Sequence, residues 1–140
     1  MKIGFTGTQV GMTDAQKEMV DDLLGGLFIT GDKNYELHHG DCIGADYEAA
    51  TLARESGYFI TAHPPSDTKK RAYFKSDAYT QPKPYLERNY DIVDATGLLV
   101  ATPKQNHEVL RSGTWATVRY ARKRKKPIVL VYPDGSAEQE

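Results

Sequence analysis

Short apolar runs alternate along the chain with segments of helical periodicity, and this alternation predicts a parallel α/β fold. The expected strands are five short runs at 2–6, 35–39, 58–63, 97–101 and 128–132, and all but 35–39 are rich in apolar or β-branched residues. The expected helices lie between them at 13–24, 45–56, 85–94 and 114–125. The last strand is a short β-branched run, which is typical of a sheet buried on both faces.

The expected helices have recognisable ends. Thr13 and Gln16 form a capping box, in which each side chain binds an unpaired amide of the first turn. Gly25 and Gly26 are expected to end this helix, residues 30–34 to form a turn, and Gly57 to end the second helix.

Two segments depart from the alternation. Residues 64–84 contain four prolines, a basic run and three aromatic residues. Long loops in compact domains are usually functional or mobile, so this segment is either a surface excursion with a short helix or a lid that contacts ligand. Residues 133–140 are predicted to be a polar tail.

Composition narrows the class of protein. The chain has 140 residues, a net charge of −1 and one cysteine, which indicates one domain over residues 1–140 without disulfides or a cysteine-only zinc site. No apolar run is long enough to cross a membrane. The N-terminus enters strand-like sequence at once without a signal peptide, so we expect a cytoplasmic protein.

Unusual residues follow three of the expected strands, where parallel sheets bind ligands. Glycine allows close backbone approach, and a helix N-terminus offers amides and a positive dipole end, so together they predict a phosphate cradle. The candidate positions are Thr6, Gly7, Thr8 and Gln9 after the first strand; Gly40, Asp41, Gly44, Ala45 and Asp46 after the second; and Arg111, Ser112, Gly113 and Thr114 after the fourth.

Several common sites are absent from the pattern. The glycines lack the spacing of a dinucleotide-binding fold, and no Walker-type phosphate loop is present. His38 and His39 are adjacent and point to opposite faces of a strand, while His63, His107 and Cys42 add no metal-ligand spacing. We therefore expect no metal and no cofactor, and we interpret His39 as a hydrogen-bonded structural residue.

Two carboxylates and one arginine are candidates for chemistry. Asp46 lies in the first turn of its helix, where the dipole favours a carboxylate, so it has either that structural role or a role in holding a ribose hydroxyl or in acid–base catalysis. Glu87 is a second candidate acid. Arg88, beside Asn89, suits phosphate recognition or an ordinary surface salt bridge.

Basic residues are concentrated near the C-terminus. Seven of them and no acidic residue lie between Arg111 and Lys126, and five crowd the end of the last expected helix, where cations complement the dipole. A nucleic-acid-binding patch is the alternative interpretation.

The motifs resemble those of the SLOG superfamily, which includes the Lonely Guy phosphoribohydrolases and the Rossmann domain of DNA-processing protein A. The resemblance is carried by residues 38–46, 87–89 and 111–117, and the His-Gly-…-Gly-Ala-Asp pattern looks like that of small standalone members, some carried by phages. It implies a Rossmann-like three-layer domain with a mostly parallel five-stranded sheet in the order 3-2-1-4-5. A phage-encoded member would act in the host cytoplasm.

The resemblance also implies a pocket for a nucleotide. The strand-end residues would form its walls, and residues 112–114 would take the phosphate. The Lonely Guy enzymes carry Gly-Gly-x-Gly-Thr-x-x-Glu, whose glutamate serves hydrolysis. Here Gly113 and Thr114 match that motif, but Thr117 stands in place of the glutamate, which looks closer to DNA-processing protein A.

Three functions follow from these observations. The first is binding of a nucleotide or nucleotide-derived signal, as a sensor or sponge. The second is an N-glycosidase acting on a nucleoside monophosphate, with Asp46 or Glu87 as catalytic residue and Arg88 and Arg111 holding the phosphate. The third is single-stranded nucleic-acid binding through residues 119–126 and 69–74. We also expect a homo-oligomer, with Trp115 and Tyr120 as candidate contacts.

Overall fold

The computed structural model describes residues 1–30 and 34–140. The strands are β1 (Lys2–Gly7), β2 (Glu36–His39), β3 (Phe59–Ala62), β4 (Ala78–Tyr79), β5 (Leu98–Thr102), β6 (Ile128–Val131) and β7 (Ala137–Gln139). The helices are α1 (Asp14–Thr30), α2 (Ala45–Glu55), α3 (Tyr85–Ala95) and α4 (Gly113–Lys123), with a 3-10 turn η1 (Thr68–Lys70).

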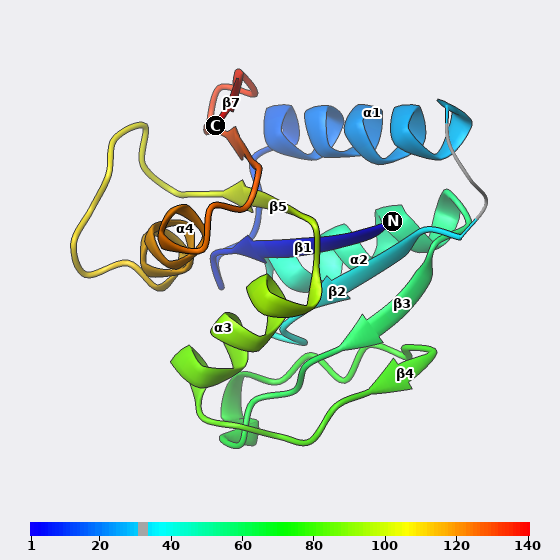
Figure 1. Ribbon diagram of the computed structural model, residues 1–140, viewed down its shortest axis with the longest axis vertical. Coiled ribbons are helices and arrows are strands. Elements are labelled where there is room, and N and C mark those ends of the chain that lie inside the picture. The colour runs from blue at the N-terminus through cyan, green and yellow to red at the C-terminus, as the bar shows by residue number, and fades with distance from the viewer. Residues whose placement is uncertain (31–33) are drawn as a thin grey trace.

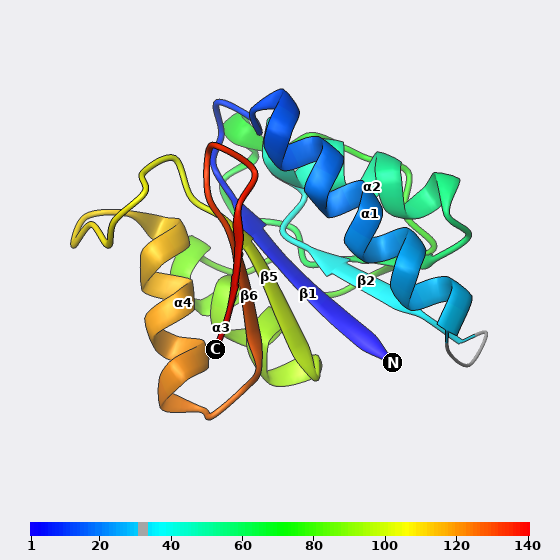
Figure 2. The same cartoon turned by 90° about the horizontal axis from the view of Figure 1, so that it is seen from above.

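The strands form one sheet in the order β4-β3-β2-β1-β5-β6-β7, parallel except for β7 (Figure 1). Helices α1 and α2 cover one face, and α3 and α4 cover the other (Figure 2). The Rossmann-like three-layer fold is therefore confirmed, and the five predicted strands are neighbours in the predicted order. Strand order reverses between β1 and β5, because the chain runs outward in opposite directions from these two central strands.

The prediction of five strands was wrong at both edges of the sheet. Within the 64–84 segment, β4 pairs with β3 through Ala78 and Tyr79. The predicted polar tail folds back as β7, because a turn with Gly135 at φ 87° reverses the chain and Arg122 binds both carboxylate oxygens of Glu140. Neither edge strand has an apolar pattern that the sequence could reveal. Each is stabilised instead by pairing with a strand that lies elsewhere in the sequence.

Helix α1 begins as predicted but ends later. The Thr13 amide donates to Gln16 Oε1 and the Gln16 amide to Thr13 Oγ1, both at 3.0 Å, which confirms the capping box. Gly25 and Gly26 do not end the helix, because Leu27 continues its apolar face onto the core. The turn predicted at 30–34 includes residues 31–33, which lie outside the described residues.

Small residues let α2 approach the sheet closely. Ala49, Ala50 and Ala53 are fully buried against the core formed by β1, β2 and β3. Gly57, at φ 92°, follows this helix as predicted. In the described part of the chain, no helix is long and apolar enough to cross a membrane.

Candidate functional site

Three adjoining cavities lie along the edge of the sheet where β1, β2 and β5 end, and Gln9 and Tyr85 border all three. The floor recess, of about 10 Å³, is also lined by Thr6, Gly7, Cys42, Asp46, Arg88 and Asn89. The segment-side cavity, of about 230 Å³, is also lined by Cys42, Pro65, Ser66, Asp67 and Lys70. The α4-side cavity, of about 220 Å³, is also lined by Gly7, Thr8, Lys104, Ser112, Gly113 and Thr114. They form one cleft at the switch point of the sheet.

The loop after β1 packs directly on the start of α2. The Ala45 amide donates to the Thr8 carbonyl at 3.0 Å, which satisfies one amide of the helix N-terminus. Gly44 has φ 89°, and a Cβ there would collide with the Gln9 carbonyl. A Cβ on Gly7 would lie 2.5 Å from the Ala45 Cβ and from Thr102 Oγ1. These glycines allow two loops to meet at the wall of the cleft.

Arg88 supports the cleft from below and is 2% exposed. Its guanidinium donates to the Gly40 carbonyl, to the His63 carbonyl at 3.2 Å and to Asn89 Oδ1 at 2.7 Å. Its Cζ lies 5.1 Å from the centroid of the Tyr85 ring. The planar guanidinium therefore joins the loop after β2 to α3 and places a positive charge at the floor recess.

Asp46 is the acidic group of the floor recess. Its Oδ2 accepts the Cys42 amide at 3.2 Å. Burial raises the pKa of Asp46 to about 6, an effect that the positive charge of Arg88 opposes. Burial also raises the pKa of the Cys42 thiol, which keeps that thiol neutral. Asp46 can therefore gain or lose a proton near neutral pH.

Asp41 faces the 64–84 segment. Its Oδ2 accepts Arg71 Nε at 2.8 Å and its Oδ1 accepts the Phe74 amide at 2.9 Å, and the side chain is fully buried. The Ala72 amide donates to the Asp41 carbonyl at 2.8 Å. Asp41 borders none of the three cavities and anchors the segment that forms one wall, so its predicted contact with a ligand stays untested.

The start of α4 offers donors to the α4-side cavity. Ser112 Oγ accepts the Trp115 amide at 3.2 Å, and the Ser112 carbonyl accepts the Ala116 amide at 2.9 Å. The amides of Gly113 and Thr114 have no acceptor within the helix. Lys104 is exposed beside them and forms no ion pair in the part of the chain that the structure describes. This end of the cleft suits an anion.

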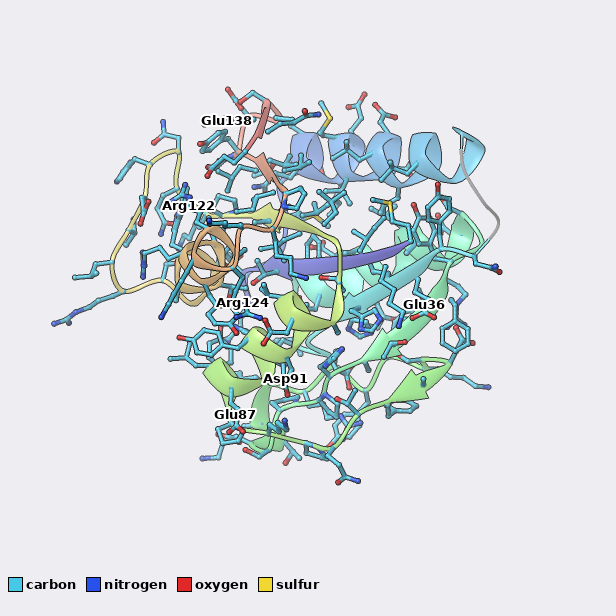
Figure 3. The ribbon with its side chains drawn as sticks, in the orientation of Figure 1. Glu36, Glu87, Asp91, Arg122, Arg124 and Glu138 are labelled. Carbon is cyan, nitrogen blue, oxygen red and sulfur yellow. The ribbon has the colours of Figure 1, made fainter. Side chains whose placement is uncertain are left out.

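Glu87 and Arg111 are exposed and border none of the three cavities. Glu87 lies at the N-terminal end of α3 (Figure 3). Successive residues of a helix point about 100° apart, so α3 turns Arg88 and Asn89 inward and Glu87 outward. Arg111 belongs to the loop before α4. The structure therefore does not bring the predicted acid Glu87 or the predicted phosphate ligand Arg111 to the cleft.

The remaining predicted positions divide into two groups. Gly40, Gly44 and Ala45 shape the loops without bordering the cleft, and a Cβ on Gly40 would lie 2.7 Å from the Arg88 guanidinium. The predicted positions that do border it are Thr6, Gly7, Thr8, Gln9, Asp46, Arg88, Asn89, Ser112, Gly113 and Thr114. Their contact with a ligand stays a prediction.

Sequence reasoning did not single out Tyr85 or Lys104 as parts of the site. Tyr85 is 41% exposed although it is a large aromatic residue, and it borders all three cavities of the cleft. Its position one turn before Arg88 could have suggested a role. The 64–84 segment was one of the candidates for ligand contact, but the sequence did not show which of its side chains, such as Asp67 and Lys70, border the cleft.

The histidines are packed inside the protein. His38 Nδ1 lies 2.7 Å from His63 Nε2, and burial lowers the pKa of His63 to about 4. His39 Nδ1 accepts the Asp41 amide at 2.9 Å, which confirms a structural role, and burial lowers its pKa to about 3. Among the described residues, no group of three or more histidines, cysteines or acids could hold a metal ion.

Three of the seven basic residues between Arg111 and Lys126 form ion pairs with described residues. Arg119 and Arg122 bind Glu108 at 3.1 and 2.7 Å, and Arg122 also binds Glu140 at 2.6 Å. Arg124, which follows α4, binds Asp94 at 3.2 Å, and Arg122 and Arg124 are labelled in Figure 3. Acids from other elements therefore pair with part of a run that is purely basic in the sequence.

Comparison with solved structures identifies the fold. The chain is similar to the molybdenum cofactor binding protein of the phototrophic bacterium Rippkaea orientalis, with 21% identity over 94% of this chain and 76% of that one and a TM-score of 0.71. It is also similar to the molybdenum cofactor carrier protein of Chlamydomonas reinhardtii, with 25% identity over 92% and 74% of the two chains and a TM-score of 0.65.

A third similar structure is DNA processing protein A from Helicobacter pylori, described for its single-stranded DNA binding, with 18% identity over 93% of this chain and 64% of that one and a TM-score of 0.64. No protein-family model matches the chain, and no curated protein matches it either. The solved structures have SLOG-type Rossmann-like folds, so the resemblance seen in the motifs is confirmed at the level of the fold.

Proposed function

We propose that this SLOG-fold protein binds a nucleotide, or a small molecule derived from one, in the cleft at the carboxyl ends of β1, β2 and β5. The observation that carries the proposal is the convergence of donors on the α4-side cavity. The amides of Gly113 and Thr114 and the ammonium of Lys104 border it, and the buried guanidinium of Arg88 lies beneath the adjoining recess. A phosphate is the ligand group that this combination suits best.

The rest of the ligand would lie across Gln9 and Tyr85 toward the segment-side cavity. Tyr85 offers an exposed aromatic ring there, which is a suitable surface for a flat heterocycle. The phosphate end and the ring end of a nucleotide would then occupy the two larger cavities. This arrangement makes the 64–84 segment a wall of the binding site.

Binding without turnover is favoured over hydrolysis. Thr117, where the Lonely Guy enzymes have a glutamate, is fully buried and its hydroxyl donates to the Gly113 carbonyl at 2.9 Å. It supplies no carboxylate to the cleft. The names of the structural neighbours support binding as well, since two hold the molybdenum cofactor and one binds single-stranded DNA. A sensor or sponge is the role that fits.

Isothermal titration with mononucleotides, cyclic nucleotides and ADP-ribose derivatives tests the proposal. We expect at least one to bind, and Lys104→Gln to weaken it about five- to tenfold because one charge–phosphate contact is lost. Lys123→Gln is the matched control, since Lys123 is exposed at the other end of α4 and borders none of the three cavities. The absence of any binding would refute the proposal, as would equal losses in the two variants.

Asp46 supports a second candidate, an N-glycosidase acting on a nucleoside monophosphate. Its pKa of about 6 and its position in the floor recess suit a group that stabilises positive charge or exchanges a proton. Chromatography would detect the released base, and Asp46→Asn should abolish the release. Full activity of Asp46→Asn would reject this role, and release of any base would reject the pure binding function.

Single-stranded nucleic acid is a less favoured ligand of the basic run, because three of its seven cations, Arg119, Arg122 and Arg124, are already paired with acids. A gel shift at low salt tests this directly, since phosphate contacts are strongest there. We keep self-association in the cytoplasm as a proposal. Trp115 is 2% exposed and packs in the core, which leaves Tyr120 as the accessible candidate for a subunit contact.

A further inference from the structure

One wall of the segment-side cavity is formed by the short 3-10 turn η1 and the residues just before it. Asp67 is the residue that caps this turn and Lys70 is its last residue, so the two are three positions apart. Side chains three apart on a 3-10 turn lie on the same side, and both residues border the cavity. No ion pair joins them in the described part of the chain, so both keep polar groups for a ligand.

The other walls of this cavity suit a flat ring. Pro65, Tyr85 and Cys42 line it with largely apolar surface, and Ser66 and Gln9 add polar groups at its border. Its volume of about 230 Å³ is smaller than the roughly 300–1,000 Å³ of a pocket for a whole ligand. The cavity therefore has room for one ring system of a larger molecule.

The two polar side chains define which edge of a ring fits. Asp67 Oδ1 accepts the Lys69 amide at 3.0 Å, which fixes the carboxylate and leaves its other lone pairs as acceptors only. Lys70 is a donor only. The complementary edge has two adjacent N–H donors followed by a carbonyl oxygen. That is the 2-amino-4-oxopyrimidine edge, which guanine and pterins share.

Other bases fit this pair of side chains poorly. Adenine and cytosine place a ring nitrogen lone pair beside their amino group, and uracil places a carbonyl on each side of its single N–H. Each would set a lone pair against the Asp67 carboxylate, and unpaired polar groups of this kind are strongly disfavoured.

We propose that the segment-side cavity selects a ligand with a 2-amino-4-oxopyrimidine edge, a guanine nucleotide or a pterin, through Asp67 and Lys70. This inference rests on the proposed function, because it assigns the ring of the same ligand whose phosphate occupies the α4-side cavity. Asp67 accepts the two N–H groups and Lys70 donates to the carbonyl oxygen.

Isothermal titration on the whole chain has two arms. The purine arm compares GMP with AMP, and the pteridine arm compares pterin with lumazine, so the two sources of the edge are distinguished. We expect a preference of about ten- to hundredfold for GMP or for pterin in at least one arm, as a good bidentate contact discriminates. The arm with the preference identifies the source.

Asp67→Asn provides the decisive variant, because asparagine also caps a turn and so preserves η1. An amide pairs with one N–H and one carbonyl, so the variant should prefer XMP over GMP, or lumazine over pterin, reversing the wild-type order. Lys70→Gln should weaken the binding of GMP or pterin. Lys69→Gln should leave that binding unchanged, because the Lys69 side chain borders none of the three cavities.

Two results would overturn the inference. Compounds that bind without a preference for GMP over AMP and without one for pterin over lumazine, or an Asp67→Asn variant that still favours GMP over XMP and pterin over lumazine, would remove the role of Asp67 while the binding function stands. If no compound in either arm binds and the wider nucleotide panel also fails, the binding function itself is refuted, and the inference is refuted with it.

Discussion

Asp41→Asn tests whether a buried ion pair holds the 64–84 segment in place. Asp41 is fully buried and accepts from Arg71 Nε at 2.8 Å and from the Phe74 amide at 2.9 Å. Asparagine has nearly the same shape and tolerates the φ of 53° at this position. The substitution therefore removes the negative charge and one acceptor while changing the backbone preference little.

The magnitude follows from those two contacts. A hydrogen bond to a charged group contributes about 1.5–3 kcal/mol, and removing one partner of a buried ion pair costs about 3–5 kcal/mol. The Arg71 side chain is 19% exposed, so water screens part of its charge after the substitution. We expect the free energy of unfolding to fall by about 2–4 kcal/mol. Domains of this kind have about 5–15 kcal/mol, so the variant should still fold.

Urea denaturation of the wild type, Asp41→Asn, Arg71→Gln and the double variant measures the pair. We expect a coupling energy of at least about 1 kcal/mol, together with faster hydrogen exchange at the Phe74 amide. Arg124→Gln is the control, because Arg124 binds Asp94 at 3.2 Å on the surface, outside this segment, and should couple weakly with Asp94. A loss below about 1 kcal/mol without coupling would refute the reasoning.

Four further perturbations can be checked by denaturation. Gly44→Ala should cost at least about 2 kcal/mol, because φ is 89° and the new Cβ meets the Gln9 carbonyl. Gln16→Leu should cost about 2–4 kcal/mol, since it breaks two buried bonds of 2.9 Å from its amide. The stability that depends on neutral His63, whose pKa is lowered to about 4, is present above pH 6.5 and is lost toward pH 4. Asp46, with its pKa raised to about 6, favours the folded state as the pH falls. Asp46→Asn should therefore make the free energy of unfolding fall more steeply with decreasing pH. The same slope of free energy against pH in the wild type and the variant would contradict this.

The central part of the fold could be predicted because its signals are local. Strands β1, β3, β5 and β6 are rich in apolar or β-branched residues, β2 follows the same alternation with helices, and helix ends are marked by residues such as Thr13, Gln16 and Gly57. Strands β4 and β7 carry no such pattern, because pairing with β3 and β6 stabilises them from outside. Helix α1 passes Gly25 and Gly26 because burial of Leu27 outweighs the low helix propensity of glycine.

The candidate site was predictable in outline for a similar reason. Parallel strands end at one edge, so residues after β1, β2 and β5 had to meet there. The direction of each side chain was not predictable, since Asp41 faces Arg71 and Glu87 faces solvent. Arg88 lies one position from Glu87 on the same turn and is buried under the cleft.

The amino-acid sequence by itself determined the central strands and helices, the parallel order of those strands and the edge of the sheet where the candidate residues meet, because periodicity and capping act between near neighbours. Only the tertiary structure decided which charges remain available to a ligand. Acids from distant elements pair with Arg119, Arg122 and Arg124, while Lys104, Asp67 and Lys70 border the cleft without an ion pair in the described part of the chain. Ion pairing depends on distance in space, and the fold sets that distance between residues far apart in the chain.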